Sequence, residues 1–205
     1  MTGVEDQRPR IPLLDVEDMN AEQRRLHDFV VSGPRGQMIG PLRAAIHSPE
    51  LASAWSALGE FLRYRTCLPS RLNELAIIVT GRRWTAQVEW WVHARAAAAA
   101  GLRQEVVHAI AALESPDFDD AAEFEVYEFT RALQQTGRVP ADTYNAVLGR
   151  WGARGVVELT AVIGYYTMVS QTLNAHQLPL PEGATGLPPE TILVTLPSGR
   201  HGSAS

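Results

Sequence analysis

The sequence predicts an all-α fold built from about seven to nine helices. Apolar residues recur three and four positions apart along most of the chain, which is the spacing of one face of an α-helix. Clusters of glycine and proline separate these periodic segments, as expected of connections between helices. No convincing set of segments alternates apolar and polar residues, so we expect no sheet at the core.

The chain of 205 residues divides into a lead-in, one domain and a tail. Residues 1–18 are predicted to be extended because two prolines disfavour a helix there. Residues 19–176 are predicted to form a single all-α domain, a size that can bury a core. Residues 177–205 are proline-rich and are predicted to be a mobile tail, in which residues 191–195 form a short extended segment.

Capping signals locate the helices. Asn20, with Gln23 three positions later, has the pattern of a capping box and predicts a helix over residues 21–31. Ser48 followed by Pro49 and an acidic residue predicts the start of another. A glycine-rich loop is expected over residues 33–41, and further helices over about 42–47, 49–65, 71–80, 86–100, 103–113, 120–136, 140–152 and 154–174.

The stretch from Ser70 to Gly101 combines apolar periodicity with ionisable residues more densely than the rest of the chain. We predict two helices here, with Ser70 and Thr85 as N-caps and Gly101 as a left-handed C-cap. Glu74 lies within an apolar run, where a buried carboxylate needs a partner or a raised pKa. We therefore expect any chemistry of this protein to lie in this stretch.

Glu74, Glu89 and His93 are the candidate catalytic residues. Glu89 and His93 are four positions apart, so their side chains share one helix face. A carboxylate beside an imidazole raises the imidazole pKa and fixes its tautomer, as in a proton shuttle. The alternatives are an ordinary helix-surface pair for Glu89 and His93, and a salt bridge to an arginine such as Arg71 or Arg82 for Glu74.

The sequence offers two other candidate sites, a metal site and a reactive thiol. Glu74, Glu89 and His93 could supply three metal ligands, but no HExxH or paired-histidine motif supports such a site. We therefore predict no metal and no other cofactor. Cys67 follows an arginine-rich turn that could lower the pKa of its thiol, although a lone buried cysteine is the favoured interpretation.

Composition excludes several classes of function. The net charge of −5 argues against a non-specific nucleic-acid binder. All 18 basic residues are arginine, which excludes lysine Schiff-base chemistry and a phosphate-loop lysine. A single cysteine excludes an intrachain disulfide and a two-cysteine redox centre. With no bilayer-length apolar run and no signal-peptide pattern, we expect a cytoplasmic protein without a membrane partner.

Glu74, His93 and the two positions 86 and 89 between them have the spacing of a known motif. This spacing resembles that of the carboxymuconolactone decarboxylase and alkylhydroperoxidase D family, whose peroxidase branch has a CxxC pair at the middle positions. Ala86 and Glu89 stand there in this chain, so it resembles a branch that lacks the CxxC pair. Further segments similar to the family follow in order at residues 40–55, 68–78, 88–102 and 157–175.

The resemblance implies an alkylhydroperoxidase D-like helical fold and a homo-oligomer, commonly a trimer or hexamer, with sites near subunit contacts. Thiol peroxidase chemistry needs a thiolate and a resolving thiol, which Ala86 and Glu89 cannot supply. Decarboxylation needs neither thiol nor metal. The resemblance therefore implies a cofactor-independent lyase in which His93 donates a proton, Glu89 orients it and Glu74 is a relay or structural partner.

The expected substrate is a small molecule, either a carboxylated lactone or a related carbonyl acid. Arg43, from the glycine-rich loop, is the predicted ligand of the substrate carboxylate. Trp90 and Tyr165 belong to two aromatic pairs that suggest a broad apolar pocket. The alternatives are a related lyase or isomerase in aromatic degradation or natural-product metabolism, and a binding oligomer without catalysis.

Overall fold

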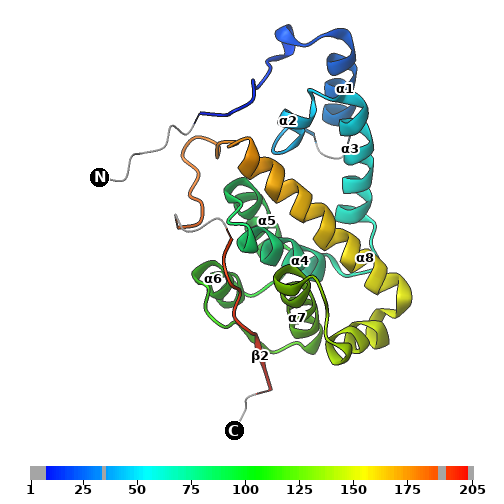
Figure 1. Ribbon diagram of the computed structural model, residues 1–205, viewed down its shortest axis with the longest axis vertical. Coiled ribbons are helices and arrows are strands. Elements are labelled where there is room, and N and C mark those ends of the chain that lie inside the picture. Colours follow the sequence, from blue (N-terminus) through cyan, green and yellow to red (C-terminus); the bar gives the residue numbers. More distant parts are fainter. Residues whose placement is uncertain (1–7, 34–35, 189–192, 203–205) are drawn as a thin grey trace.

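The computed structural model describes residues 8–33, 36–188 and 193–202, and this part of the chain contains eight α-helices (Figure 1). The helices are α1 (Ala21–Ser32), α2 (Leu42–Ala45), α3 (Pro49–Tyr64), α4 (Ser70–Arg83), α5 (Gln87–Ala99), α6 (Gln104–Ala112), α7 (Ala121–Thr136) and α8 (Ala141–Ala175). A 3₁₀ turn, η1 (Val16–Asp18), precedes them, and two short strands, β1 (Asp117–Phe118) and β2 (Arg200–His201), pair in parallel. The predicted all-α fold is confirmed. None of the helices in the described part combines the length and apolarity needed to cross a membrane.

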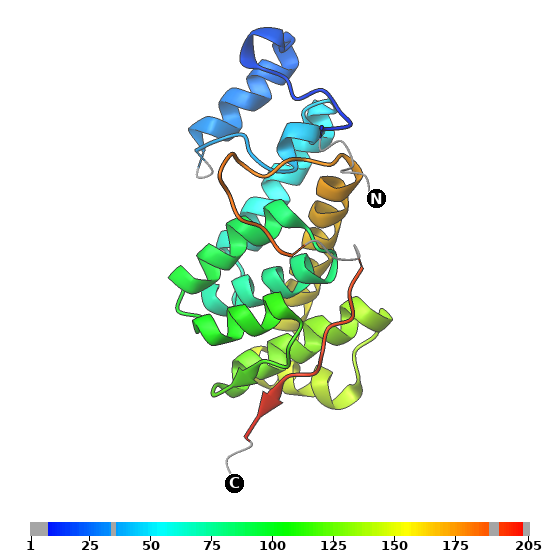
Figure 2. The ribbon, with the colours of Figure 1, turned by 90° about the vertical axis from the view of Figure 1, so that its left-hand side faces the viewer.

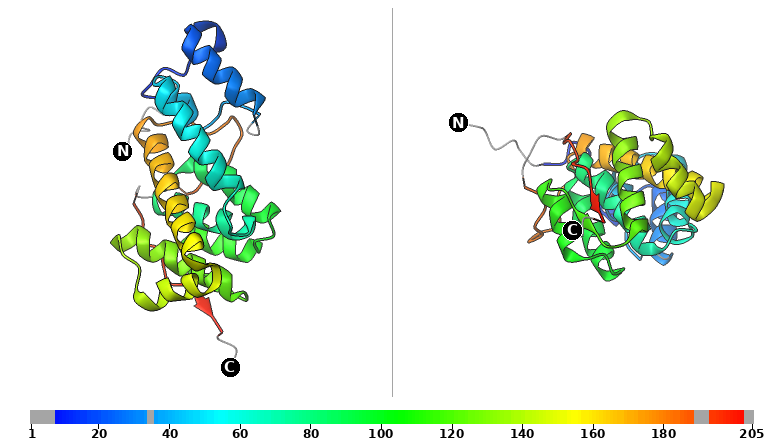
Figure 3. Two further views of the ribbon diagram at one scale, coloured as in Figure 1. Left: turned by 90° about the vertical axis from the view of Figure 1, so that its right-hand side faces the viewer. Right: turned by 90° about the horizontal axis from the view of Figure 1, so that it is seen from below.

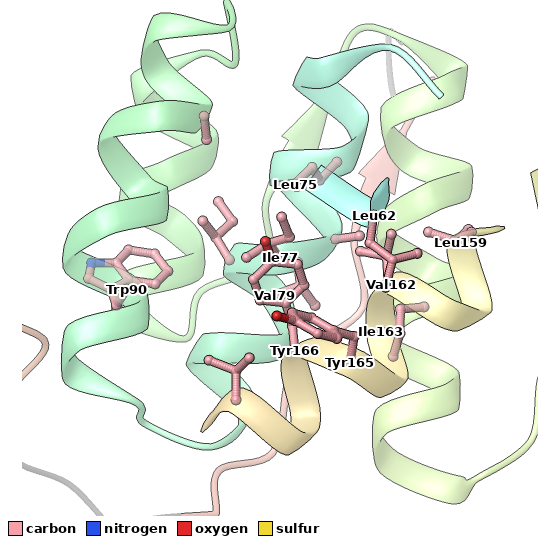
Figure 4. Close-up of a cluster of buried hydrophobic side chains, with 14 of the residues drawn as sticks. Leu62, Leu75, Ile77, Val79, Trp90, Leu159, Val162, Ile163, Tyr165 and Tyr166 are labelled. Atoms are coloured by element: carbon pink, nitrogen blue, oxygen red, sulfur yellow. The ribbon is translucent and has the colours of Figure 1, made fainter. Parts of the chain in front are cut away.

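Helix α4 is the centre of the fold. Every residue from Leu72 to Arg82 is buried, and α4 packs against α5, α7 and α8. Figure 4 shows Ile77 and Val79 of α4 beside Ile163 of α8, within the main apolar cluster. A helix buried on all sides must be apolar around its whole circumference or must pair its polar groups internally. The second condition applies to α4, because its buried polar residues Asn73, Glu74, Thr80 and Arg82 all have hydrogen-bond partners.

Most predicted helix ends are found where the sequence placed them. Asn20 caps α1, and its capping box with Gln23 is complete. Gly101 and Gly137 follow α5 and α7 with φ angles of 95° and 70°. The last two predicted helices form one element, α8, which is interrupted at Gly152 with a φ of 66°. Glycine adopts these left-handed conformations without steric cost.

The N-caps predicted for α4 and α5 are wrong. Ser70 is the first residue of α4, and Pro69 occupies the N-cap position. Thr85 precedes the N-cap Ala86 and has a positive φ of 45°, which is strained for a β-branched residue. Its hydroxyl accepts a hydrogen bond of 3.1 Å from Arg82 Nη1, so a buried guanidinium supports the turn between α4 and α5.

The lead-in is not wholly extended. Residues 1–7 lie outside the described residues, and η1 adds a turn of helix that was not predicted. The backbone N–H of Arg10 donates to the carbonyl of His176 at 2.9 Å, which places the lead-in beside the end of α8. Figure 2 shows η1 and α1 at the end of the molecule opposite β2.

Beyond α8, residues 178–188 and 193–202 pack on the helices, and we call them the strap. The side-chain amide of Gln87 on α5 forms hydrogen bonds with both backbone polar groups of Leu187. Its Nε2 donates to the Leu187 carbonyl at 3.2 Å, and its Oε1 accepts from the Leu187 N–H at 2.7 Å. The N–H of Val194 donates to the carbonyl of Arg83 at 3.1 Å. The described residues of the predicted mobile tail therefore pack against the helices.

Helix α7 holds the last part of the strap in the same way. Gln135 Oε1 accepts from the Leu196 N–H at 2.9 Å, and the Tyr127 hydroxyl donates to the Pro197 carbonyl at 2.7 Å. Residues 191–192 of the segment predicted to be extended lie outside the described residues, and residues 193–195 form no strand. Leu187, Leu196 and Pro197 thus obtain their backbone hydrogen bonds from helix side chains and not from a sheet.

A leucine exchange tests whether the strap is part of the fold. Leu196 is 2% exposed, so Leu196→Ala is expected to lower the free energy of unfolding by about 2–4 kcal/mol, the usual effect of truncating a buried leucine. Urea denaturation followed by circular dichroism measures this change. Leu193→Ala is the matched control, because Leu193 lies in the same strap and is 47% exposed. Equal, negligible effects of both exchanges would show that the strap does not pack.

Candidate active site

Three ionisable side chains meet between α4 and α5. Glu74 comes from α4, and Glu89 and His93 come from successive turns of α5. His93 Nδ1 lies 2.6 Å from Glu74 Oε2, and His93 Nε2 lies 3.0 Å from Glu89 Oε1. All three side chains are buried. We call them the Glu–His–Glu cluster, in which the imidazole has a carboxylate at each ring nitrogen.

The local sequence explains why these residues meet. The i, i+4 spacing puts Glu89 and His93 on one face of α5, and the short turn after α4 makes the two helices antiparallel neighbours. That turn is anchored by the buried Arg82, whose Nε donates to the carbonyl of Ala111 at the end of α6, at 2.9 Å. The middle of α4, where Glu74 lies, is therefore brought opposite the middle of α5.

The two contacts of His93 differ in geometry. The contact with Glu74 is a hydrogen bond, whereas Glu89 Oε1 lies within ion-pair distance of Nε2 but lacks hydrogen-bond alignment. Glu89 Oε1 is a buried oxygen with no hydrogen-bond partner among the described residues. Buried carboxylate oxygens are normally satisfied, so this oxygen retains the capacity to accept a hydrogen bond.

The cluster controls the protonation of His93. Burial lowers the pKa of His93, but the negative charges of Glu89 and Glu74 and their contacts outweigh that effect and raise the pKa to about 9. At neutral pH the imidazole is therefore a cation between two carboxylates. Both ring nitrogens then carry protons, and the group is a proton donor.

Two residues that the sequence did not indicate also reach the cluster. Arg63 of α3 has its Nε 4.0 Å from Glu74 Oε1. Tyr166 of α8 places its ring 5.1 Å from the His93 ring in an edge-on arrangement, and burial raises the pKa of its phenol well above the usual range. The Tyr165–Tyr166 pair was visible in the sequence, but helical spacing alone does not say which tyrosine faces α5.

The three predicted substrate-binding residues do not gather at the cluster. Tyr165 is buried and donates from its hydroxyl to the carbonyl of Trp55 at 3.3 Å. Trp90 is also buried, and Figure 4 shows it on α5 apart from Tyr165 and Tyr166. Arg43 lies on α2, not in the preceding loop.

Arg43 lines a different cavity. This cavity has a volume of about 120 Å³, and its walls come from the lead-in, α1, the loop after it and α2. Its lining residues are Leu14, Asp15, Val16, Met19, His27, Met38, Arg43 and Ile46. No member of the Glu–His–Glu cluster is among them. Arg63, and not Arg43, is therefore the arginine that the fold brings to the cluster.

The structural alternatives weighed from the sequence are also resolved. Glu74 does not pair with Arg71, which contacts Asp120 at 2.6 Å and Glu123 at 3.0 Å. Nor does it pair with Arg82, which supports the turn described above. The predicted salt bridge to an arginine is instead made with Arg63, at 4.0 Å. Glu89 and His93 are buried, so the interpretation as a helix-surface pair is wrong.

The described residues contain no group of three His, Cys, Asp or Glu side chains arranged to hold a metal ion. In the Glu–His–Glu cluster, the carboxylates face opposite nitrogens of one ring, so no single point is shared by three ligand atoms.

Cys67 is half-buried between α3 and α4. Its backbone N–H donates to Glu158 Oε2 at 2.5 Å. Burial and the neighbouring Glu158 carboxylate raise the pKa of the Cys67 thiol, so the lowering expected from nearby arginines is not found. Cys67 is accordingly a weakly reactive thiol.

No protein-family model matches the chain, and no curated protein matches its sequence. Solved structures do resemble it. The alkylhydroperoxidase AhpD core of an uncharacterised peroxidase-related protein from Ralstonia eutropha has a TM-score of 0.68 at 12% identity, covering 85% of this chain and 93% of that chain. A second uncharacterised peroxidase-related protein, from a Silicibacter species, has a TM-score of 0.66 at 11% identity, covering 86% and 93%.

A third similar structure is a variant of the debrominase Bmp8 in complex with 2,3,4-tribromopyrrole. Its TM-score is 0.60 at 15% identity, and the match covers 85% of this chain and 91% of the debrominase chain. Likenesses at such low identity establish the fold, and the fold alone does not determine the reaction.

The raised pKa of His93 makes stability depend on pH. A histidine whose folded pKa exceeds its unfolded value stabilises the protein fully below the unfolded pKa, about 6.5, and loses this contribution as the pH rises towards 9. We expect the free energy of unfolding to fall by up to about 3 kcal/mol over this range. NMR titration of the imidazole and urea unfolding at several pH values measure the two effects.

Glu89→Gln and His108→Gln provide the comparison. Glu89→Gln removes one negative charge beside the imidazole, so the His93 pKa should fall towards 6.5 and the pH dependence of unfolding should flatten. His108 is exposed on α6, and His108→Gln should leave both measurements unchanged. A wild-type His93 that titrates near 6.5 would contradict the cluster.

Proposed function

We propose that this chain, which has the alkylhydroperoxidase D-like fold, is a cofactor-independent lyase that removes CO₂ from a small carboxylated lactone or a related carbonyl acid. The observation that supports this most is the protonated His93, held in the interior between Glu74 and Glu89. A buried cationic acid with two carboxylate partners is suited to delivering one proton to a reacting atom.

The reaction is a decarboxylation completed by protonation. The bond between the carboxylate carbon and the ring carbon breaks, CO₂ leaves, and the electron pair delocalises through the double bond into the lactone carbonyl. His93 then gives its proton to carbon, and water returns a proton to the imidazole. The carbonyl of the substrate accepts the electron pair, so no external electron acceptor is needed.

The geometry suggests which proton moves. Nδ1–H is engaged in the 2.6 Å hydrogen bond to Glu74, which fixes the ring. Nε2–H faces Glu89 without hydrogen-bond alignment, so it is the proton more easily transferred. Glu89 thus stabilises the charged imidazole next to Nε2, the nitrogen that donates the proton. Glu74 orients the ring through Nδ1.

An arginine is needed to attract an anionic substrate towards this negative cluster. Arg63 lies at the edge of the cluster, and 22% of its side chain remains exposed. A guanidinium in this position can contact solvent and Glu74 at once, and guanidinium groups bind carboxylates through paired hydrogen bonds. We assign to Arg63 the role that the sequence assigned to Arg43.

Thiol peroxidase activity does not fit this chain. The positions of the CxxC pair hold Ala86, which is fully buried at the N-cap of α5, and Glu89. Cys67 lies outside the motif and has a raised thiol pKa, which disfavours the thiolate that attacks a peroxide.

The debrominase with a similar fold binds a small halogenated ring, which supports a small cyclic substrate for this chain as well. A related isomerase would use the same donor to move a proton without loss of CO₂. A binding oligomer without catalysis has no need of two buried carboxylates that hold an imidazole in its charged form, and burying the three charges is costly. The decarboxylase is therefore the preferred function.

The test is decarboxylation of carboxymuconolactone, followed by ultraviolet absorbance and by release of CO₂. The wild type is expected to turn over, and His93→Ala should lower kcat by about 10²–10⁴-fold, the usual contribution of a general acid. His108→Ala is the matched control and should retain full activity, since His108 is exposed on α6. Activity should fall as the pH rises above about 9, because His93 then loses its proton.

Three results separate the alternatives. Full activity of His93→Ala would exclude the proposed proton donor. Product formation without CO₂ would indicate the isomerase. Turnover of a peroxide with a dithiol reductant, abolished by Cys67→Ser, would instead support a peroxidase centred on that single thiol.

A further inference from the structure

Helix α3 is apolar on two faces, although only one face is covered. The covered face contains Ala52, Trp55, Ser56, Gly59 and Leu62, all buried. The outward face contains Leu51, Ala54, Ala57, Leu58, Phe61 and Tyr64, and all of these except the half-buried Phe61 are exposed. Figure 3 (left) shows α3 on the surface of the molecule, with no other element in front of it. A helix with apolar residues on both sides is typical of one that is covered on both sides.

The exposure of this outward face is substantial. Leu51, Leu58 and Tyr64 are 55%, 48% and 51% exposed. Of the 12 large apolar residues that are exposed among the described residues, seven lie in the part of the chain from η1 to the end of α3. An exposed apolar helix face of this kind marks an interaction site.

The outward face is bordered by opposite charges. Glu50 stands in the first turn of α3 and makes no ion pair among the described residues, whereas Arg65 follows the last turn. The Arg65 side chain is 59% exposed and contacts Glu60 at 3.5 Å. The face is thus acidic at one end, apolar along its length and basic at the other end.

The face is complementary to itself. When a second α3 is laid antiparallel, Glu50 meets Arg65 of the other copy, and Leu51 meets Tyr64. The same superposition brings each alanine of the face opposite a larger residue of the other copy: Ala54 faces Phe61 and Ala57 faces Leu58. Every residue on the face therefore meets another residue of the same face, as a two-fold contact requires.

We propose that a second copy of this chain docks on the outward face of α3, forming an antiparallel helix pair about a two-fold axis that passes between Ala57 and Leu58. Alanines opposite large side chains let two helices approach to the usual interaxial distance of about 8–10 Å. The charges at the ends then specify the antiparallel orientation, because a parallel pair would place like charges together.

This contact has a consequence for the assembly and for the site. A two-fold contact is absent from a simple trimer but present in a dimer or in a hexamer with two-fold axes, so the assembly contains an even number of copies. Tyr64 belongs to the contact and Arg63, its neighbour in the chain, reaches Glu74. The contact and the Glu–His–Glu cluster are therefore joined by the last turn of α3, although the contact does not depend on the proposed reaction.

Leu58→Asp is the first test, read out as the mass of the full-length protein by sedimentation velocity. It places two carboxylates beside each other at the axis, so the dissociation constant should rise at least about 100-fold and the mass should halve. Val157→Asp is the matched control, because Val157 is an exposed apolar residue on α8. Circular dichroism confirms that both variants remain helical.

A charge exchange gives a second, independent test. Glu50→Arg and Arg65→Glu should each raise the dissociation constant by about 3–10-fold, and the double variant should restore it, because opposite charges again meet across the axis. The proposal is overturned by a monomeric wild type, by an odd-numbered assembly, by equal effects of Leu58→Asp and Val157→Asp, or by a double variant no better than the single ones.

Discussion

A charged imidazole between two carboxylates is the interaction on which the rest of this structure depends. Glu74 and Glu89 would each be costly to bury alone, and the cationic His93 compensates both. This compensation allows α4 to be buried on every side, although it carries a carboxylate in its middle. Loss of His93 would leave two carboxylates in the interior without the cation that compensates them, so the buried position of α4 depends on the imidazole.

The position of α4 against α5 follows from the turn that joins them. Thr85 adopts a conformation that a β-branched residue avoids, and Arg82 supports it from the interior while also binding the end of α6. Strain at one residue is acceptable where the surroundings fix its conformation. The buried arginine thus acts on the cluster indirectly, by holding the two helices in the alignment that brings Glu74 opposite His93.

Sequence reasoning identified the all-α fold and the pairing of Glu89 with His93, because helical periodicity and i, i+4 spacing are local properties. It did not identify Arg63 or Tyr166, since their contacts depend on how α3 and α8 cross α4 and α5. The glycine-rich loop favours Arg43 as the ligand of the substrate carboxylate, but in the fold Arg43 lines a separate cavity. The hydroxyl of Thr85 favours a helix N-cap, but in the structure this hydroxyl accepts a hydrogen bond from the buried Arg82.

The strap was expected to be mobile because prolines and small residues seldom pack on their own. In the structure, the helices supply what the strap lacks: Gln87 satisfies both backbone groups of Leu187, and Gln135 and Tyr127 satisfy those of Leu196 and Pro197. These contacts are made to main-chain N–H and C=O groups, which every residue type except proline possesses in full. The path of the strap is therefore determined by side chains of the helices that it crosses. Strap positions whose side chains face solvent can be exchanged freely in protein engineering, whereas the glutamines that receive the strap cannot.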